Sequence, residues 1–312
     1  MNFTFRQLLY AVATARCGSL SMAAEELHVS QPSLSSAIDQ IEAQLGQRVF
    51  ARRRGSGASL TPFGRTFVGQ ARRVLEEMRR LEHLSQIDSE VSGELVLGCF
   101  DDLAPYCAPA LMRRLEERWP RLRLTVQEEG FAALQRRLAD GTIDMALTYD
   151  LDAGPKIVST VLRELRPHAL FAANHRLASQ TAVSLTELAG YPLILSDQAS
   201  SWQHMLDLFR LYSLTPTVFA KTRTFEMQRS LVANGFGVAL VYADPVSNES
   251  YDGLPLSRRS ISDALPPQRI VLARDGQYPA NAAEKAVTEV ALQWFTDSAT
   301  TAYRPRPESL RR

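Results

Sequence analysis

The stretch that decides the fold is Gly18-Ser-Leu-Ser-Met-Ala-Ala-Glu-Glu-Leu-His-Val-Ser-Gln-Pro-Ser-Leu-Ser35. Its small and apolar residues predict a helix over residues 22–27, which Ser21 is placed to cap. A short turn follows, and Ser30 then caps another helix that ends at Gly46. Pro32 is tolerated in the first turn of that helix because its missing N–H would have no partner there. Two helices with so tight a connection predict a helix-turn-helix unit.

The second helix of this unit has one apolar face and one polar face. Apolar residues recur along it at intervals of four, three and four: Leu34, Ile38, Ile41 and Leu45. The exposed face begins with small or polar residues: Gln31, Pro32, Ser33, Ser35 and Ser36. Short polar side chains at a helix N-terminus suit hydrogen bonds to base edges and phosphates in a DNA major groove. The alternative is an ordinary solvated face.

The segment that follows is strongly basic. Residues 43–75 contain seven arginines and no Asp or Glu. Three of these arginines, Arg52, Arg53 and Arg54, begin a glycine-containing loop between two short apolar segments. This pattern predicts a small hairpin, or wing, that reaches phosphates or a minor groove. A basic hairpin beside a helix-turn-helix favours a DNA contact over a merely solvated charge run.

A long helix is predicted over residues 62–90, because Thr61 is a good N-cap and Pro62 stands at the first helical position. Apolar residues form a seam along it: Phe67, Ala71, Val74, Met78, Leu81 and Leu84. A lone long helix cannot bury such a seam, so we expect it to pair with the same helix of a second copy. The alternative is packing against its own chain.

From residue 91 the pattern changes to alternating strands and helices, which predicts α/β architecture with parallel sheets covered on both faces. Two such sets indicate two small lobes with a ligand site between them. A capping box is expected at Ser184 and Glu187. The Pro/Arg-rich tail, residues 299–312, is expected to be disordered.

Composition narrows the class of protein. The 312 residues carry a net charge of +1, and 45% are apolar, which is ordinary for a soluble globular chain. Three cysteines do not make a disulfide scaffold and fit a reducing compartment. We expect no membrane span, because no apolar run is long enough. Phosphate-binding, nucleophile-elbow and dinucleotide motifs are missing from the sequence and the histidines lack metal-ligand spacing, so we expect no enzyme and no metal.

The chain resembles LysR-type transcriptional regulators of bacteria over nearly its whole length. Besides residues 18–35, the resemblance lies in Ile38, Ile41-Glu42, Leu45-Gly46, Phe50, Leu60-Thr-Pro-Phe-Gly64, Gly93-Glu-Leu-Val-Leu-Gly98, Ala104-Pro105, Asp140-Gly141, Ile143-Asp144 and Val232-Ala-Asn-Gly-Phe-Gly237. It implies a winged helix-turn-helix domain (1–61), a dimerising linker helix (62–90) and an effector-binding domain (91–298) like a periplasmic binding protein. The first lobe would contain residues 91–163 and 268–298, and the second lobe residues 164–267.

The resemblance also implies site residues. Gln31, Pro32 and Ser35 match positions that read DNA, whereas Ser36 stands where relatives often have Arg. Effector-binding positions correspond to Phe100, Asp101, Asp102, Gly130, Phe131, Tyr149, Ser200, Ser201, Arg223, Thr224, Phe225 and Tyr242. Hydroxyl residues common in the first lobe of relatives are replaced here by acidic and aromatic ones. We therefore expect a zwitterionic or amine-containing effector, unless Asp101 and Asp102 merely cap the helix that starts near Ala104.

The expected partners are promoter DNA, a small-molecule co-inducer and further copies of the chain in a homodimer or homotetramer. RNA polymerase is a further candidate partner, no cofactor is expected, and the expected location is the cytoplasm. Two other functions compete with this interpretation. One is a redox-sensing regulator that uses Cys99 and Cys107. The alternative explanation of these two residues is that they are ordinary buried thiols. The other is a solute-binding transport protein, which the DNA-binding module disfavours.

Overall fold

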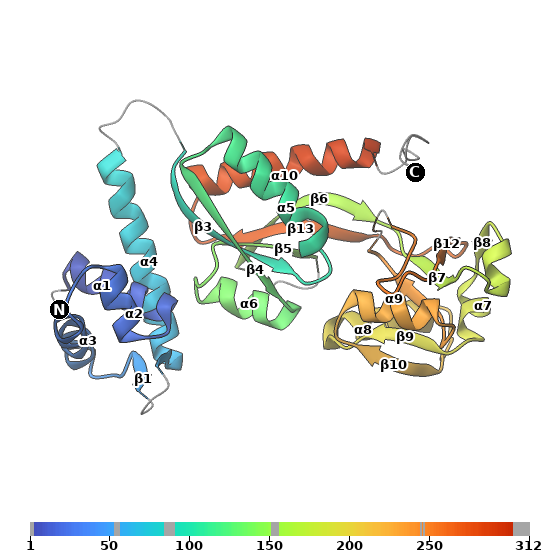
Figure 1. Ribbon diagram of the computed structural model, residues 1–312, viewed down its shortest axis with the longest axis horizontal. Helices are drawn as coiled ribbons and strands as arrows, with labels where there is room; N and C mark the ends of the chain where they lie inside the picture. Colours follow the sequence, from blue (N-terminus) through green and yellow to red (C-terminus); the bar gives the residue numbers. More distant parts are fainter. Residues whose placement is uncertain are drawn as a thin grey trace. The chain divides into compact units, whose positions relative to one another are not determined.

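The computed structural model describes residues 3–52, 57–83, 91–150, 156–243, 245 and 247–301 (Figure 1). The chain forms two compact units. The first contains Met1–Glu90 and Gln135–Asp144, and the second contains Val91–Leu134 and Met145–Arg312.

The first unit begins with two helices. Helix α1 (Phe5–Cys17) starts with a capping box between Thr4 and Gln7. Helix α2 (Leu20–Glu26) starts two residues earlier than predicted, and Ser19, not Ser21, is its N-cap. The prediction was wrong because Ser19 adopts the extended backbone that precedes a helix, while Ser21 already lies in the first turn.

Helix α3 (Gln31–Leu45) is the predicted second helix of the helix-turn-helix. The Ser30 hydroxyl accepts a hydrogen bond from the Ser33 N–H at 3.3 Å, which confirms the predicted cap. Gly46 ends the helix at φ 64°, a backbone conformation that costs glycine little. The apolar stripe of α3 is buried in a core shared with α1, α2 and the wing.

The wing is a hairpin of strands β1 (Phe50–Arg52) and β2 (Ala58–Leu60), which pair antiparallel. Buried Glu42 of α3 fixes its first strand, because one carboxylate oxygen accepts hydrogen bonds from the N–H groups of Val49 and Phe50 at 2.9 and 3.0 Å. Its other oxygen pairs with Arg48 at 2.7 Å. The wing is therefore attached rigidly to the helix that precedes it.

Helix α4 (Pro62–His83) follows the wing. The Thr61 hydroxyl accepts a hydrogen bond from the Gly64 N–H at 2.8 Å, as expected of the predicted cap. Later in α4, Arg72 Nη1 donates a 2.8 Å hydrogen bond to the Gly141 carbonyl within the same unit. Gly69 permits this packing, since a Cβ there would lie 2.2 Å from the Asp140 carbonyl oxygen.

The first lobe of the second unit is built on one five-stranded sheet in the order β4-β3-β5-β13-β6. Its strands are β3 (Gly93–Phe100), β4 (Leu122–Glu129), β5 (Met145–Tyr149), β6 (Ile157–Leu165) and β13 (Gln268–Asp275). Helix α5 (Ala104–Arg118) lies beside helix α10 (Ala282–Thr301) (Figure 1). Ion pairs between Arg118 and Glu289, at 2.6 Å, and between Arg114 and Asp297, at 2.9 Å, join these two helices. Helix α6 (Phe131–Ala139) follows β4.

The second lobe contains two smaller sheets. The four-stranded sheet has the order β11-β7-β12-β8, and the two-stranded sheet pairs β9 with β10. These strands are β7 (His168–Ala172), β8 (Ala182–Val183), β9 (Leu193–Ser196), β10 (Val218–Thr222), β11 (Ala239–Val241) and β12 (Leu256–Ile261). The helices of this lobe are α7 (Leu185–Ala189), α8 (Ala199–Arg210) and α9 (Phe225–Ala233), with a 3-10 turn at Arg176–Ser179. The predicted capping box at Ser184 and Glu187 is present.

The prediction of parallel sheets is only partly right. Strand β3 runs parallel to β4 and β5, and β9 runs parallel to β10. Strand β13 is antiparallel to both β5 and β6, and β7 is antiparallel to β11 and β12. The alternation predicted from the sequence does not include strands β6, β8 and β12. No helix separates β6 or β12 from the next strand along the chain. Strand β12 also runs parallel to β8. The antiparallel partners of β6 and β12 are β13 and β7, which lie far away in the chain, so the local alternation of strands and helices does not fix their direction.

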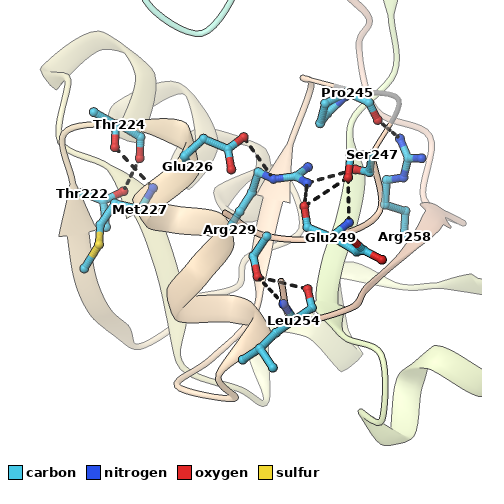
Figure 2. Close-up of polar contacts among 11 residues, drawn as sticks. Thr222, Thr224, Glu226, Met227, Arg229, Pro245, Ser247, Glu249, Leu254 and Arg258 are labelled. Atoms are coloured by element: carbon cyan, nitrogen blue, oxygen red, sulfur yellow. Dashed lines mark hydrogen bonds and ion pairs between the residues drawn. The ribbon is translucent and has the colours of Figure 1, made fainter. Parts of the chain in front are cut away.

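Buried Arg229 of α9 holds the segment that precedes β12 (Figure 2). Its Nη2 donates hydrogen bonds to the carbonyls of Ser247 and Glu249 at 2.9 and 2.5 Å. Its Nε lies 3.2 Å from a carboxylate oxygen of Glu226, one turn earlier in the helix. A charged side chain that is 2% exposed thus replaces its water contacts with protein oxygens.

Two predictions concern the ends of the described chain. Helix α10 continues to Thr301, so the first three residues of the predicted disordered tail are helical; residues 302–312 lie outside the described part. The helix can continue there because residues 299–301 are Ala-Thr-Thr, and this stretch has no helix-breaking proline or glycine. None of the helices in the described ranges is long and apolar enough to cross a membrane.

Candidate functional site

The N-terminal turn of α3 presents the polar residues that the sequence singled out. Gln31, Pro32, Ser33 and Ser36 are exposed, and Ser35 is partly buried. Two of these side chains already have protein partners: Gln31 Oε1 accepts a 3.1 Å hydrogen bond from the Ser21 hydroxyl, and the Ser33 hydroxyl lies 2.8 Å from that of Ser30. The turn is therefore held in place while its outer surface remains accessible.

The wing is attached to the same helix through Glu42. Arg52 is the last residue of β1. Arg53 and Arg54 lie outside the described residues. The arrangement of α2, α3 and an attached basic hairpin is that of a winged helix-turn-helix, whose second helix enters a major groove.

The first residues of the apolar seam of α4 are covered by their own chain, whereas Val74, further along, is exposed. Phe67 makes an edge-on contact with Phe3, with ring centroids 5.8 Å apart, and Ala71 is buried, so the start of the seam packs against its own chain. Val74 is 45% exposed, and Met78 is partly buried. The side chain of Leu81 and the whole of Leu84 lie outside the described part.

A second candidate site lies where the two lobes of the second unit meet. Strands β3 and β5 run parallel, so their carboxyl ends share one edge of the sheet. Asp101 and Asp102 follow β3, and Tyr149 ends β5. We call the group formed by these three residues with Gln198, His204 and Tyr242 of the second lobe the lobe junction. Ligands of α/β proteins bind at such strand ends.

Gln198 joins the two lobes directly. Its Oε1 accepts a 3.0 Å hydrogen bond from the Phe131 N–H at the start of α6. Its Nε2 donates a 3.2 Å hydrogen bond to Asp101 Oδ2. Gly130 leaves room for this amide, because a Cβ there would lie 3.1 Å from Gln198 Oε1. The side-chain amide thus satisfies one donor and one acceptor of the first lobe.

Asp101 and Asp102 do not cap the next helix. The N-cap of α5 is Leu103, and no side chain makes a cap hydrogen bond there, so the capping interpretation is wrong. The reason is that Leu103 lies between the carboxylates and the helix, with the Leu103 N–H bonded to the Phe100 carbonyl at 2.8 Å. Both carboxyl groups are instead available to the lobe junction.

The pKa values of these carboxyl groups are raised. Burial and the Asp101 charge raise the pKa of Asp102 to about 6. Burial and repulsion by Glu128 and Glu129 raise the pKa of Asp101, against a lowering effect of Arg223 from the second lobe. Negative charge therefore outweighs positive charge at this edge of the sheet, and Asp102 titrates near neutral pH.

Aromatic rings continue across the lobe junction. Phe100 and Tyr149 meet edge-on with centroids 5.4 Å apart, and Tyr149 lies 6.5 Å from Tyr242 of the second lobe. The Tyr242 hydroxyl is 3.1 Å from His204 Nε2. Burial lowers the pKa of His204, so its imidazole is neutral at pH 7 and adds no positive charge.

The remaining predicted effector residues differ in their surroundings. Ser200 and Ser201 lie in the first turn of α8, and Thr224 is the N-cap of α9, where its hydroxyl accepts a hydrogen bond from the Met227 N–H at 3.2 Å (Figure 2). Phe225 packs in the second-lobe core. The Phe131 side chain is buried as well, so only its N–H reaches the lobe junction.

Sequence reasoning missed two residues of the lobe junction, Gln198 and His204. Gln198 follows strand β9, and its position at a strand end was the one signal that pointed to it. The sequence predicts no role for His204, because its spacing from the other histidines fits no metal site and is typical of an ordinary surface or core residue. Among the described residues no group of three or more His, Cys, Asp and Glu side chains could hold a metal ion.

The two cysteines considered for redox sensing are buried. Cys99 and Cys107 are both 0% exposed, and the Cys107 thiol donates to the Leu103 carbonyl at 2.9 Å. A hydrogen bond with Cys99, together with burial, raises the pKa of Cys107 well above its usual value. Reactive cysteines are accessible and have lowered pKa values, so these thiols have the character of structural ones.

Comparisons with known proteins agree with this architecture. Residues 5–65 match the family described as "Bacterial regulatory helix-turn-helix protein, lysR family", and residues 88–296 match the "LysR substrate binding domain". The chain is 27% identical to the HTH-type transcriptional regulator YvbU of Bacillus subtilis (strain 168), over 94% of this chain and 99% of that protein. It is 31% identical to the regulator YnfL of Escherichia coli (strain K12), over 78% and 83%.

Solved structures show the same relationship. HinK, a LysR family transcriptional regulator from Pseudomonas aeruginosa, is 28% identical with a TM-score of 0.63, and the match covers 94% of this chain and 99% of that one. A full-length OxyR variant from Pseudomonas aeruginosa, 24% identical over 93% and 98% of the two chains, has a TM-score of 0.77 and shares the fold. The winged helix-turn-helix, the two-lobed domain and both family matches together show that this chain belongs to the LysR family of DNA-binding transcriptional regulators with an effector-binding domain.

Proposed function

We propose that this protein is a homo-oligomeric bacterial regulator, rather than an enzyme, that reads promoter DNA and responds to a small molecule bound at the lobe junction. The domain division proposed from the sequence, with residues 1–61 for DNA, 62–90 for dimerisation and 91–298 for the effector, stays part of this proposal. We also propose that the protein acts in the cytoplasm and that RNA polymerase is a further partner.

The observation that carries the DNA-binding part is the exposed first turn of α3 beside an attached wing. Gln31, Pro32 and Ser35 lie at the end of the helix that enters a major groove in proteins of this architecture. Gln31 has an amide with a donor and an acceptor, which suits an adenine edge. Arg52, Arg53 and Arg54 follow in the wing, where their charges would contact phosphates.

The experiment begins with DNA that the full-length protein selects from a random-sequence pool. Replacement of Gln31 by alanine should weaken binding to the selected sequence by about 1–3 kcal/mol and relax one base position. Gln44→Ala is a matched control, because Gln44 is an exposed glutamine in the last turn of the same helix. Equal losses on selected and random DNA, or equal effects of the two variants, would contradict the assignment.

The oligomer is supported by the exposed part of the α4 seam. Val74 is nearly half exposed on a helix whose earlier apolar residues are covered by their own chain. A second copy of the same helix would cover the exposed part in a symmetric contact, in which each residue meets its counterpart. This interface would set two α3 helices at a fixed spacing on DNA.

Control by a ligand is supported by the composition of the lobe junction. Contacts between the lobes there include the polar Gln198 bridge and the ring contact between Tyr149 and Tyr242. A ligand that exchanges hydrogen bonds with this bridge would shift how the two lobes pack. A ligand shifts such an equilibrium only by its difference in affinity for the two arrangements.

A further inference from the structure

The carboxyl group of Asp102, at the lobe junction, has no hydrogen-bond donor among the described residues. The Asp102 side chain is partly buried, and within the described ranges no side chain or N–H donates a hydrogen bond to its carboxyl group. The charged group that acts on Asp102 is Asp101, and Asp101 in turn is near the acids Glu128 and Glu129 and near Arg223. A buried carboxylate is costly unless a positive or hydrogen-bonding group accompanies it.

The Gln198 amide occupies the place where an anion would otherwise be favoured. The N-terminus of α6 offers the Phe131 N–H, and Gln198 Oε1 accepts from it. A ligand carboxylate in this position would lose the second half of the bridge, because it has no hydrogen to donate to Asp101. Its charge would also lie beside the Asp101 carboxylate, which is unfavourable at short range.

From these two observations we infer that the ligand of this regulator presents a protonated amine to Asp102, beside the rings of Tyr149 and Tyr242, and places no carboxylate at the start of α6. This inference rests on the proposed function, since it names the ligand class of the same site. A second, anionic end of the ligand would lie on the side of Arg223. The site would therefore bind amines and zwitterions but not simple carboxylates.

The aromatic rings supply the rest of the amine site. The faces of Tyr side chains attract cations within about 6 Å of the ring centroid, most strongly when water is excluded. Tyr149 and Tyr242 are 8% and 5% exposed, and their centroids are 6.5 Å apart. Tyr149 lies near Asp102, because the Asp102 charge adds to the effect of burial in raising the pKa of the Tyr149 hydroxyl. His204 stays neutral beside Tyr242 and does not repel a cation.

The test uses full-length protein and two matched series of small molecules that differ only in charge. One series is 2-phenylethylamine, phenylalanine and 3-phenylpropionate, and the other is butylamine, norvaline and pentanoate. Thermal shift and calorimetry near pH 7.5 should show binding of a cation or zwitterion, with the matched anion at least about tenfold weaker. Asp102→Asn should weaken amine binding about tenfold or more, whereas Glu289→Gln, on α10, should leave it unchanged.

A second variant tests the role of the amide. Gln198→Ala frees the start of α6, so the anions of both series should gain affinity while amine binding at Asp102 persists. Anions that bind wild-type protein as tightly as the matched amines, or two series in which no amine binds, would overturn the inference.

The DNA experiment separates this inference from the proposed function. Selective DNA binding together with anion preference would leave the regulator standing and remove the amine site. Amine binding without selective DNA binding would keep the amine site and contradict the proposed DNA-binding function. A cooperative urea transition of Asp102→Asn shows that the variant is folded.

Discussion

Gln198 and Asp101 lie 97 residues apart in the chain, yet the Nε2 of Gln198 donates a 3.2 Å hydrogen bond to the Oδ2 of Asp101. The same amide accepts from the Phe131 N–H, so one side chain of the second lobe contacts two segments of the first. A polar bridge of this kind is specific in geometry but modest in free energy, which suits a junction that must respond to a ligand.

Replacement of Gln198 tests the bridge itself. Gln198→Ala should lower the free energy of unfolding by about 1–3 kcal/mol, because Asp101 and the Phe131 N–H lose their partner. Gln198→Glu should cost more, since its carboxylate faces that of Asp101. Urea denaturation measures both. Gln203→Ala is the matched control, because Gln203 on α8 bonds only to Asp207 within its own helix; a loss as large as that of Gln198→Ala would contradict the prediction.

The raised pKa of Asp102 makes stability depend on pH in a stated direction. The folded protein holds the Asp102 proton up to about pH 6, whereas the unfolded chain releases it near the model-compound value of 3.8. The unfolded state therefore binds fewer protons in this window, and the contribution of Asp102 to stability falls as pH rises from 3.8 through 6. Asp102→Asn removes this loss.

Urea denaturation between about pH 4.5 and about pH 7.5 checks the sign. The free energy of unfolding of Asp102→Asn, relative to wild type, should increase by about 2 kcal/mol over this range. Asp252→Asn is a control, because hydrogen bonds from Ser250 and Asn234 lower the pKa of Asp252 to about 2, below the range. A relative stability of Asp102→Asn that falls with rising pH would refute the assignment.

Arg229 should be essential for the second lobe (Figure 2). Arg229→Met keeps most of the volume of the side chain but leaves the carbonyls of Ser247 and Glu249 without their donor, at roughly 1–3 kcal/mol each. Chemical denaturation and hydrogen exchange of residues 247–250 measure the loss. Glu226→Gln should cost less than about 1 kcal/mol, because Glu226 is 49% exposed. Equal effects of the two variants would show that the buried bonds contribute nothing.

The buried cysteines should resist labelling. In native protein N-ethylmaleimide should modify Cys17 well before Cys99 or Cys107, because Cys17 is partly exposed and the other two are buried. Mass spectrometry of labelled peptides gives the order, and denatured protein serves as the reference. Hydrogen peroxide should leave DNA binding of the Cys17→Ser variant unchanged. Rapid labelling of Cys107, or peroxide-sensitive binding, would restore the redox-sensing alternative.

A charge at Val74 should disrupt the oligomer. Val74→Asp would place a carboxylate in the proposed contact between α4 helices, where its desolvation is costly. Sedimentation velocity should show a smaller species, with weaker binding to selected DNA. Val74→Thr has nearly the same shape without a charge and should stay close to wild type. An unchanged sedimentation profile for Val74→Asp would place the interface elsewhere.

Local signals in the sequence were enough for the elements of the DNA-binding unit. Ser30 and Gly46 mark the ends of α3, and Thr61 marks the start of α4, because a cap depends on the few N–H or C=O groups beside it. The same holds for the capping box at Ser184 and Glu187. Helix α6 (Phe131–Ala139) follows Gly130 directly and ends two residues before Gly141, so glycines mark both of its ends in the sequence.

Tertiary structure decided what depends on residues distant in the chain. Strand β13 lies antiparallel between β5 and β6, both far from it in the chain, and the alternation of elements does not predict this place. Asp102 is a partly buried carboxyl rather than a cap because Leu103 is the N-cap residue of α5. Gln198 and His204 carry no motif, and only the packing of two lobes brings them to Asp101 and Tyr242. Caps and apolar stripes arise within a few turns of chain, whereas a polar site is assembled from side chains whose neighbours the sequence does not specify.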